Sequence, residues 1–308
     1  MVAMSSAQPR EGENSVPDTE QLVPFAVKPY RYLRLAIVVV VLAAVASVLI
    51  ERSHTHCWQG SISAYYYTPV HSVFVGALVA LGVSMIAIKG STDVEDMLIN
   101  VAGVLAPIVA FVPTSPPSDT CASTAFVGGD AKAFIDNNVL ALAIGSGVAI
   151  LTAYAVALVG GKASIRKVSP ASVLGLVLGA ALLAVGLIWY FGFRDSFLEH
   201  AHSWTAGVMF VLIGVVIFIN ARGSRRISRL RGTGQGYSVV YAALLGVMVL
   251  SAVGVLIAKN VDRDWRHQIL LLEILELLAF AVFWVMQTAE HWAGGVAIGN
   301  ERVARAAA

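Results

Sequence analysis

The amino-acid sequence predicts an all-α membrane protein, a polytopic transmembrane bundle of about eight helices with both termini in the cytoplasm. Of its 308 residues, 57% are hydrophobic and 13% are charged, whereas a soluble domain has about 25% charged residues. The hydrophobic residues form runs of about 20, the length that crosses a bilayer as a helix. Runs such as 37–46 lack the in-out alternation of a barrel strand. In hydrocarbon, the backbone hydrogen bonds of these runs must therefore be formed within helices.

The same composition argues against two other classes of protein. With 21 basic and 19 acidic residues the net charge is +2, which gives no overall electrostatic footprint for a nucleic acid. Two cysteines cannot staple a chain of this length as a disulfide-rich secreted module. The expected partner is therefore the lipid bilayer, and the expected location is the cell membrane.

Polar tails are predicted on both sides of a single bundle. Residues 1–28 are rich in Ser, Pro, Glu and Gln and have little apolar periodicity, which predicts a disordered cytoplasmic tail. No signal-peptide cleavage site separates this tail from the first apolar run, so the run is expected to stay as a membrane helix. The bundle then covers residues 29–293, and residues 294–308 form a short cytoplasmic tail.

Eight apolar stretches meet the length requirement for a span. In chain order these predicted spans are 33–50, 69–88, 97–113, 138–160, 172–192, 200–220, 237–258 and 268–290.

Two of the spans carry further local signals. Asp93, Glu95 and Asp96 precede or open the third span, where acidic groups suit the positive end of the helix dipole. Gly175 and Gly179 give the fifth span a face of small residues, on which a neighbouring helix can approach closely. We interpret the acidic residues as helix capping and the glycines as packing.

The positive charges in the connections predict the orientation. Placing the N-terminus inside puts 15 of the 21 lysines and arginines in the cytoplasm. Five of these arginines lie between Arg222 and Arg231, a predicted loop that would meet anionic lipid headgroups at about 1 kcal/mol per charge. An arrangement of seven spans would lose this alternation of charge.

The predicted topology places both cysteines outside, Cys57 in the first outer loop and Cys121 in the second. Disulfides persist in that compartment, so we expect the two residues to be bonded. The alternative is two free thiols, because a bond requires the Cα atoms to come within about 7 Å.

Ionisable residues within the hydrocarbon are costly and are therefore functional candidates. Glu273 and Glu276 share one face of the eighth span, roughly 8 and 12 Å below its outer boundary. His71, Glu199 and His202 enter the membrane at similar depth. We expect the five side chains to close on one outward-facing cavity, the alternative being that the two glutamates form a hydrogen-bonded tie between helices.

Carboxylates and imidazoles can bind a metal, carry protons or form an acid/base pair. The chain contains no His-Glu-x-x-His and no Cys-x-x-Cys segment, so no complete metal motif supports one of these chemistries over the others. The sequence therefore leaves the catalytic residues, the metal and the cofactor open.

The segment Ser61-Ile62-Ser63-Ala64-Tyr65-Tyr66-Tyr67 leads into Phe74-Val75-Gly76, and Ala102-Gly103 leads to Pro113-Thr114. This pattern resembles a group of uncharacterised bacterial polytopic membrane proteins, many of them from actinobacteria. The resemblance covers mainly residues 58–114. It implies an integral protein of the bacterial plasma membrane and implies no activity.

Three functions are compatible with these observations. The first is a non-catalytic accessory protein, which we slightly favour. The second is a proton- or ion-linked transporter that uses the glutamate cavity, although no repeat between halves and no paired helix interruptions are evident. The third is a membrane enzyme, metal-dependent or not, acting on a lipid or envelope precursor.

Overall fold

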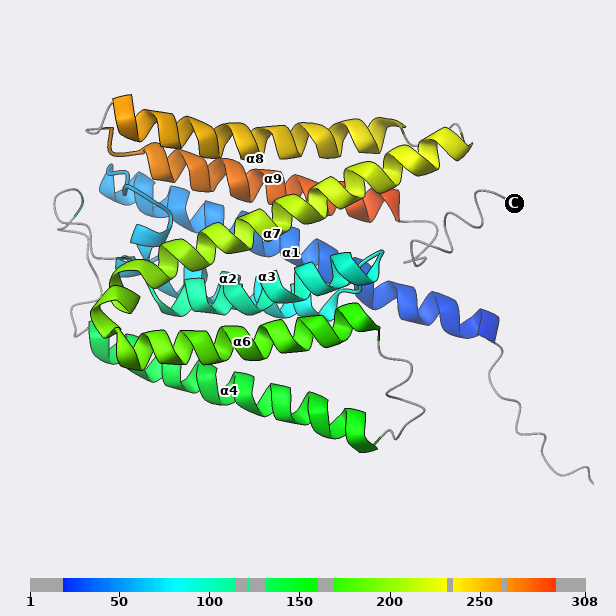
Figure 1. Cartoon of the computed structure of the whole chain (residues 1–308). Helices are drawn as coiled ribbons and strands as arrows, with labels where there is room; N and C mark the ends of the chain where they lie inside the picture. The colour runs from blue at the N-terminus through cyan, green and yellow to red at the C-terminus, as the bar shows by residue number, and fades with distance from the viewer. Residues whose placement is uncertain are drawn as a thin grey trace, which may run out of the picture.

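The computed structural model describes residues 19–114, 121, 131–159, 169–231, 235–261 and 265–291. These residues form eight α-helices and one short 3-10 helix, with no strand among them, and successive α-helices run in opposite directions (Figure 1). The elements are α1 (Thr19–Thr55), η1 (Ser63–Tyr67), α2 (His71–Ala87), α3 (Asp93–Phe111), α4 (Ala131–Val159), α6 (Pro170–Gly192), α7 (Arg194–Arg231), α8 (Gln235–Val261) and α9 (Gln268–Glu290).

The prediction of an all-α, multi-pass membrane protein is confirmed at this level. In the described part of the chain, seven helices are long and apolar enough to cross a bilayer. The eighth, α2, has 17 residues and measures about 26 Å along its axis, at the lower limit for a span. Each of the eight apolar stretches found in the sequence thus has its own helix.

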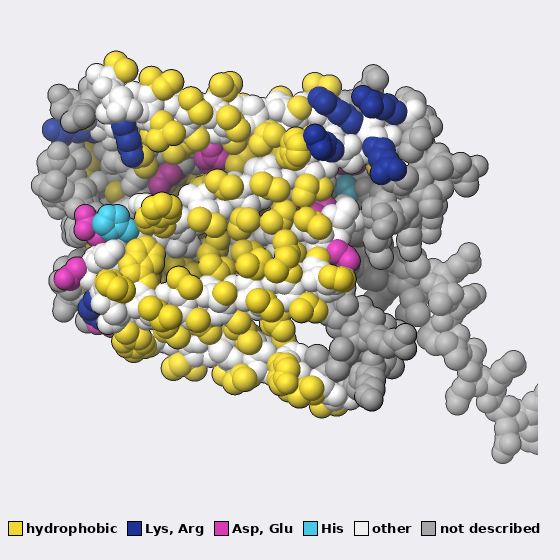
Figure 2. All heavy atoms as spheres, viewed as in Figure 1, with side chains coloured by type: hydrophobic (Ala, Val, Ile, Leu, Met, Phe, Trp, Pro, Cys, Tyr) yellow, Lys and Arg dark blue, Asp and Glu magenta, His cyan; other side chains and the backbone are white. Residues whose placement is uncertain are grey.

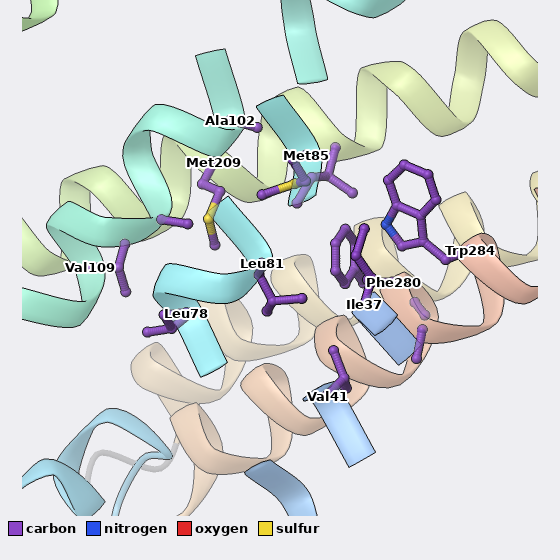
Figure 3. Close-up of a cluster of buried hydrophobic side chains, with 14 of the residues drawn as sticks. Ile37, Val41, Leu78, Leu81, Met85, Ala102, Val109, Met209, Phe280 and Trp284 are labelled. Atoms are coloured by element: carbon purple, nitrogen blue, oxygen red, sulfur yellow. The ribbon is translucent and has the colours of Figure 1, made fainter. Parts of the chain in front are cut away.

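Six of the helices form a closed ring. In the order α1, α2, α3, α7, α8 and α9, each helix packs against the next, and α9 returns to α1. Their inward faces form one hydrophobic core, where Ile37, Met85 and Trp284 are almost completely buried. Figure 3 shows Ile37 and Val41 of α1 close to Phe280 and Trp284 of α9.

Helices α4 and α6 lie outside this ring, against α3 and α7 (Figure 1). Their most apolar windows have no buried residue, and the surface of the molecule is covered with hydrophobic side chains on the side shown in Figure 2. Such surfaces would drive aggregation in water. They are the surfaces that a bilayer covers.

Two helices extend beyond the predicted spans. Helix α1 begins at Thr19, within the stretch 1–28 that was predicted as a tail. Helix α7 continues to Arg231, so the predicted loop from Arg222 to Arg231 is the helical end of α7, and its basic side chains gather at one end of the molecule (Figure 2). Arginine is a good helix former, and cations stabilise the C-terminal end of a helix.

Helices α2 and α3 approach each other closely at two glycines. A Cβ atom added to Gly82 would lie 2.6 Å from the carbonyl oxygen of Gly103, and one added to Gly103 would lie 2.8 Å from that of Gly82. The predicted small-residue face of α6 makes a looser contact: a Cβ on Gly175 would lie 3.3 Å from Met97, and one on Gly179 would meet nothing within 4 Å.

We expect Gly82→Ala to destabilise the protein by about 1 to 3 kcal/mol, because the new methyl group must push backbone atoms of α3 aside. Gly76→Ala is the matched control on the same helix, since a Cβ there meets nothing within 4 Å and alanine favours a helix by up to about 1 kcal/mol. Thermal unfolding in detergent measures both. Equal melting temperatures for the two variants would contradict the close contact.

Candidate functional site

A cavity of about 1030 Å³ lies between α7, α8, α9 and the segment before η1. We call it the α7–α9 groove. One wall follows α7 from His202 to Phe218, a length of roughly 24 Å at 1.5 Å per residue. Figure 2 shows acidic side chains in a hollow among hydrophobic ones on this face. The volume suits an organic ligand of ordinary size.

The polar residues of the groove are concentrated towards one end of the bundle. We call this the disulfide end, and it comprises residues 55–71, 111–114, 121, 192–194, 259–261 and 265–268. Lys259 and Arg266 line the groove there, together with Ser61 and Ser63. Farther in, the walls become apolar, ending at residues such as Phe218 and Leu245. The groove therefore has a polar mouth and a hydrophobic depth.

Glu276 lies between these two regions. Its side chain is only 4% exposed, lines the groove, and accepts one hydrogen bond through Oε1, from the Ser251 hydroxyl of α8 at 3.1 Å. Its other oxygen, Oε2, has no hydrogen-bond partner among the described residues. A buried carboxylate oxygen without a partner is costly, so Glu276 is the group of the groove that most needs a ligand.

Glu273, one turn earlier, has a different role. Its carboxylate accepts hydrogen bonds from the backbone N–H of Ile62 and from the Ser63 hydroxyl, where η1 begins. A backbone N–H at the start of a helix, such as that of Ile62, has no partner within the helix, and a carboxylate is a favourable acceptor for it. Glu273 therefore ties α9 to the segment that closes the mouth. The sequence left two alternatives open for the glutamates, a cavity or a tie between helices. Glu276 faces the cavity with a free oxygen, and Glu273 forms the tie.

His202 also lines the groove but is held by the backbone. It is 4% exposed, and its Nδ1 lies 2.8 Å from the carbonyl oxygen of Val112, at the end of α3. A neutral imidazole with a hydrogen at Nδ1 would donate to that carbonyl and keep Nε2 as an acceptor. The structure thus brings His202, Glu273 and Glu276 to one cavity.

The other two predicted site residues lie elsewhere. His71, at the start of α2, has Nδ1 2.8 Å from the carbonyl oxygen of Tyr66, and its ring stacks edge-on against the Tyr66 ring. The Glu199 side chain is 70% exposed on the surface of α7. Neither lines the groove. The spacing of His71 and Glu199 along the sequence predicted how deep they lie in the membrane. Which way each side chain faces depends on the rotation of its helix, and packing sets that rotation.

The predicted disulfide is present: Cys57 and Cys121 are bonded, with their Cα atoms 5.9 Å apart. The bond joins the segment before η1 to the connection between α3 and α4. The sequence therefore identified the covalent link that holds the disulfide end together.

The three tyrosines of η1 are buried. Tyr67 donates a hydrogen bond to the carbonyl oxygen of Thr114 at 2.7 Å, and Tyr65 accepts one from the Gln59 N–H at 3.4 Å. Burial raises the pKa of Tyr67 to about 12, so its hydroxyl stays protonated as a donor at neutral pH. The tyrosines position the segment that forms the mouth.

A second polar cluster lies at the opposite end of the bundle. Glu95 of α3 is 1% exposed and accepts hydrogen bonds from the Ser91 N–H, from Asn220 Nδ2 and from Gln287 Nε2, each at 2.9 Å. These hydrogen bonds join the segment between α2 and α3 to α7 and α9. Because three donors converge on a buried carboxylate, the cluster satisfies the requirements for burying a charge.

Neighbouring contacts extend this cluster to α8. Glu290 accepts hydrogen bonds from the Ser224 hydroxyl at 2.6 Å and from the Tyr241 hydroxyl at 2.7 Å. Arg34 of α1 is also buried and lies within electrostatic reach of Tyr241. We call these residues, with Glu95, Asn220 and Gln287, the Glu95 cluster.

The sequence interpretation of Glu95 as a helix cap was incomplete. Thr92 is the cap, since its hydroxyl accepts from the Glu95 N–H at 3.1 Å, and the Glu95 carboxylate reaches other helices. The available signal was a set of polar residues near span ends, Asn220 and Gln287 among them. Nothing in their spacing, however, indicates that they meet.

The described residues contain no group of three or more His, Cys, Asp or Glu side chains placed to hold a metal ion. Comparisons of the chain with protein-family models, with curated proteins and with solved structures find no match. The geometry of the groove and of the Glu95 cluster is therefore the basis for a functional proposal.

We expect Glu95→Gln to lower stability by about 2 to 3 kcal/mol, because the amide loses the charge and turns an NH₂ group towards donors. Asp93→Asn is the control, since Asp93 is an exposed carboxylate in the same turn and its change should stay within about 0.5 kcal/mol. The melting temperature in detergent reports both. A Glu95→Gln protein as stable as the control would show that the cluster does not hold the bundle together.

Proposed function

We propose that this integral membrane protein binds an amphiphilic molecule in the α7–α9 groove and acts as a non-catalytic accessory protein. One observation carries the proposal: the groove has a polar mouth with Lys259 and Arg266, a buried carboxylate at Glu276, and apolar walls beyond it. A molecule with a polar head and a hydrocarbon tail matches this sequence of environments. Its tail would replace water along the walls, at about 25 cal/mol per Å² of apolar surface removed from water.

The use of the polar groups favours binding over catalysis. General acid/base chemistry needs two groups that are free to exchange protons with a substrate. Glu273 is engaged with the backbone of η1, and one nitrogen of His202 with the Val112 carbonyl. Among the described carboxylates that line the groove, this leaves Glu276 with a free oxygen.

The Glu95 cluster beyond the groove supports holding a ligand over carrying it across the membrane. The groove ends near Phe218 of α7, and Asn220 of the Glu95 cluster follows two residues later. A transporter would have to open this hydrogen-bonded cluster in each cycle. The proposed state is therefore a pocket that is open at the disulfide end.

We place the disulfide end outside the cell and both termini in the cytoplasm, with eight spans. The excess of lysine and arginine on the other side supports this orientation, as does the Cys57–Cys121 bond, which needs an oxidising compartment to persist. In this orientation Arg222, Arg225 and Arg226, all exposed at the end of α7, would contact anionic headgroups of the inner leaflet.

We also propose that the chain belongs to the bacterial membrane proteins that it resembles over residues 58–114. Support comes from the contact between the two halves of the motif, since Tyr67 donates to the carbonyl oxygen of Thr114. A pattern whose parts are far apart in sequence and meet in space is what a shared structural feature would produce. The bacterial plasma membrane is then the proposed location.

The orientation can be tested on intact cells. We expect a membrane-impermeant maleimide to label Cys57 and Cys121 only after an impermeant reductant has been added, because the disulfide blocks both thiols and faces outwards. A Cys57→Ser, Cys121→Ser protein gives the background, since the chain has no other cysteine. Labelling that requires permeabilised cells would reverse the proposed orientation.

Ligand binding can be tested by filling the groove. Ala252 and Val253 of α8 are both exposed, but Ala252 lines the groove and Val253 lies outside it. We expect Ala252→Phe to lower the binding of an added amphiphile at least about tenfold, and Val253→Phe to leave it unchanged, because only the first ring occupies the groove. A loss of about 1.4 kcal/mol in binding energy gives this factor.

The probes for this experiment are decylamine, decanol and decanoate, which share one tail and differ in head group. Native mass spectrometry of the detergent-purified protein counts the molecules bound to each variant. Equal binding of all three probes by the Ala252→Phe and Val253→Phe proteins would place the binding site elsewhere or remove the proposal.

A further inference from the structure

We propose that the ligand of the α7–α9 groove is a cationic amphiphile, a long-chain amine or ammonium whose positive head group pairs with Glu276. This inference rests on the proposed function and adds the chemical class of the ligand. Its basis is the Glu276 carboxylate, which is 4% exposed and lines the cavity, with Oε2 unpartnered in the described part of the chain.

Among the described residues, Glu276 accepts one hydrogen bond and takes part in none of the ion pairs. Ser251 donates to Oε1 at 3.1 Å, which leaves the carboxylate far short of the several donors that a buried charge requires. Glu95 shows how this chain satisfies a buried carboxylate, with three donors at 2.9 Å. The contrast indicates that a ligand entering the groove supplies the hydrogen-bond donors and the charge that Glu276 lacks. An ammonium group would supply both charge and donors.

The cations at the mouth do not fill this role. Lys259 and Ser251 lie on the same helix and are separated by roughly 12 Å along its axis. Lys259 is exposed, whereas Glu276 is buried, and a separation of about 12 Å is far beyond hydrogen-bond distance. Lys259 therefore does not supply the missing partner of Glu276 Oε2, which has none among the described residues.

The dimensions of the groove specify the position of the tail. From Ser251, which marks the level of Glu276, the lining continues along α8 to Leu245, roughly 9 Å farther from the mouth. Phe210, Val215 and Phe218 of α7 form the facing apolar wall. A hydrocarbon tail extends into this region when the head group is at Glu276. A metal ion or a hydrophilic amine would leave the same wall uncovered.

The test compares probes with one tail and three head groups on the full-length protein in detergent. We expect the wild type to bind decylamine more tightly than decanol or decanoate. Glu276→Gln should weaken decylamine binding at least about tenfold and decanol binding much less, so that the preference for the amine is lost. Glu276→Asp, which keeps the charge, should retain most of the preference for the amine.

Glu199→Gln is the control for net charge, because it removes an exposed carboxylate on the surface of α7, outside the groove, and should bind like the wild type. If Glu276→Gln and wild type bind decylamine equally while Ala252→Phe abolishes binding, the groove is the site and the cationic class is wrong. Preferential binding of decanoate that Lys259→Gln removes would assign an anionic amphiphile instead. No effect of Ala252→Phe would refute the proposed function itself.

Discussion

The bundle depends on one constraint: a polar group buried in hydrocarbon must find its partner within the protein. The Glu95 cluster meets this constraint, because carboxylates, amides and hydroxyls from α3, α7, α8 and α9 pair with one another. Four of the six helices of the ring are thereby joined at one end. The polar contacts set the register of these helices, while the apolar core holds them together without specifying a register.

The disulfide end is organised by a different set of contacts. There the Cys57–Cys121 bond, the Tyr67–Thr114 hydrogen bond and the Glu273 carboxylate all act on the segment around η1. This segment is short and would otherwise have many conformations to lose. Three independent contacts hold it against α9 and the end of α3, and so give the groove a defined mouth.

Between the two ends, the buried Glu276 carboxylate meets this constraint only in part. It has one hydrogen-bond donor where Glu95 has three. Proteins tolerate an unsatisfied buried group where it serves binding or catalysis. A rigid scaffold that surrounds one incomplete carboxylate is the arrangement expected of a preorganised ligand site.

The sequence by itself determined the fold class, the position of each helix and the disulfide partners. Length and composition were sufficient, because a hydrocarbon environment permits few backbone structures and requires long apolar runs. It also identified Glu273 and Glu276, since carboxylates stand out in an apolar span. The orientation and the family resemblance are predictions from the same sequence that the structure does not test.

Tertiary structure decided which of these residues meet. It separated His71 and Glu199 from the groove, assigned Glu273 to the backbone of η1, and brought Asn220 and Gln287 to Glu95. Helical spacing gives depth and relative face within one helix, whereas contacts between helices depend on the rotation and neighbour of each one. Those are set by packing around the whole ring, and local sequence does not contain them.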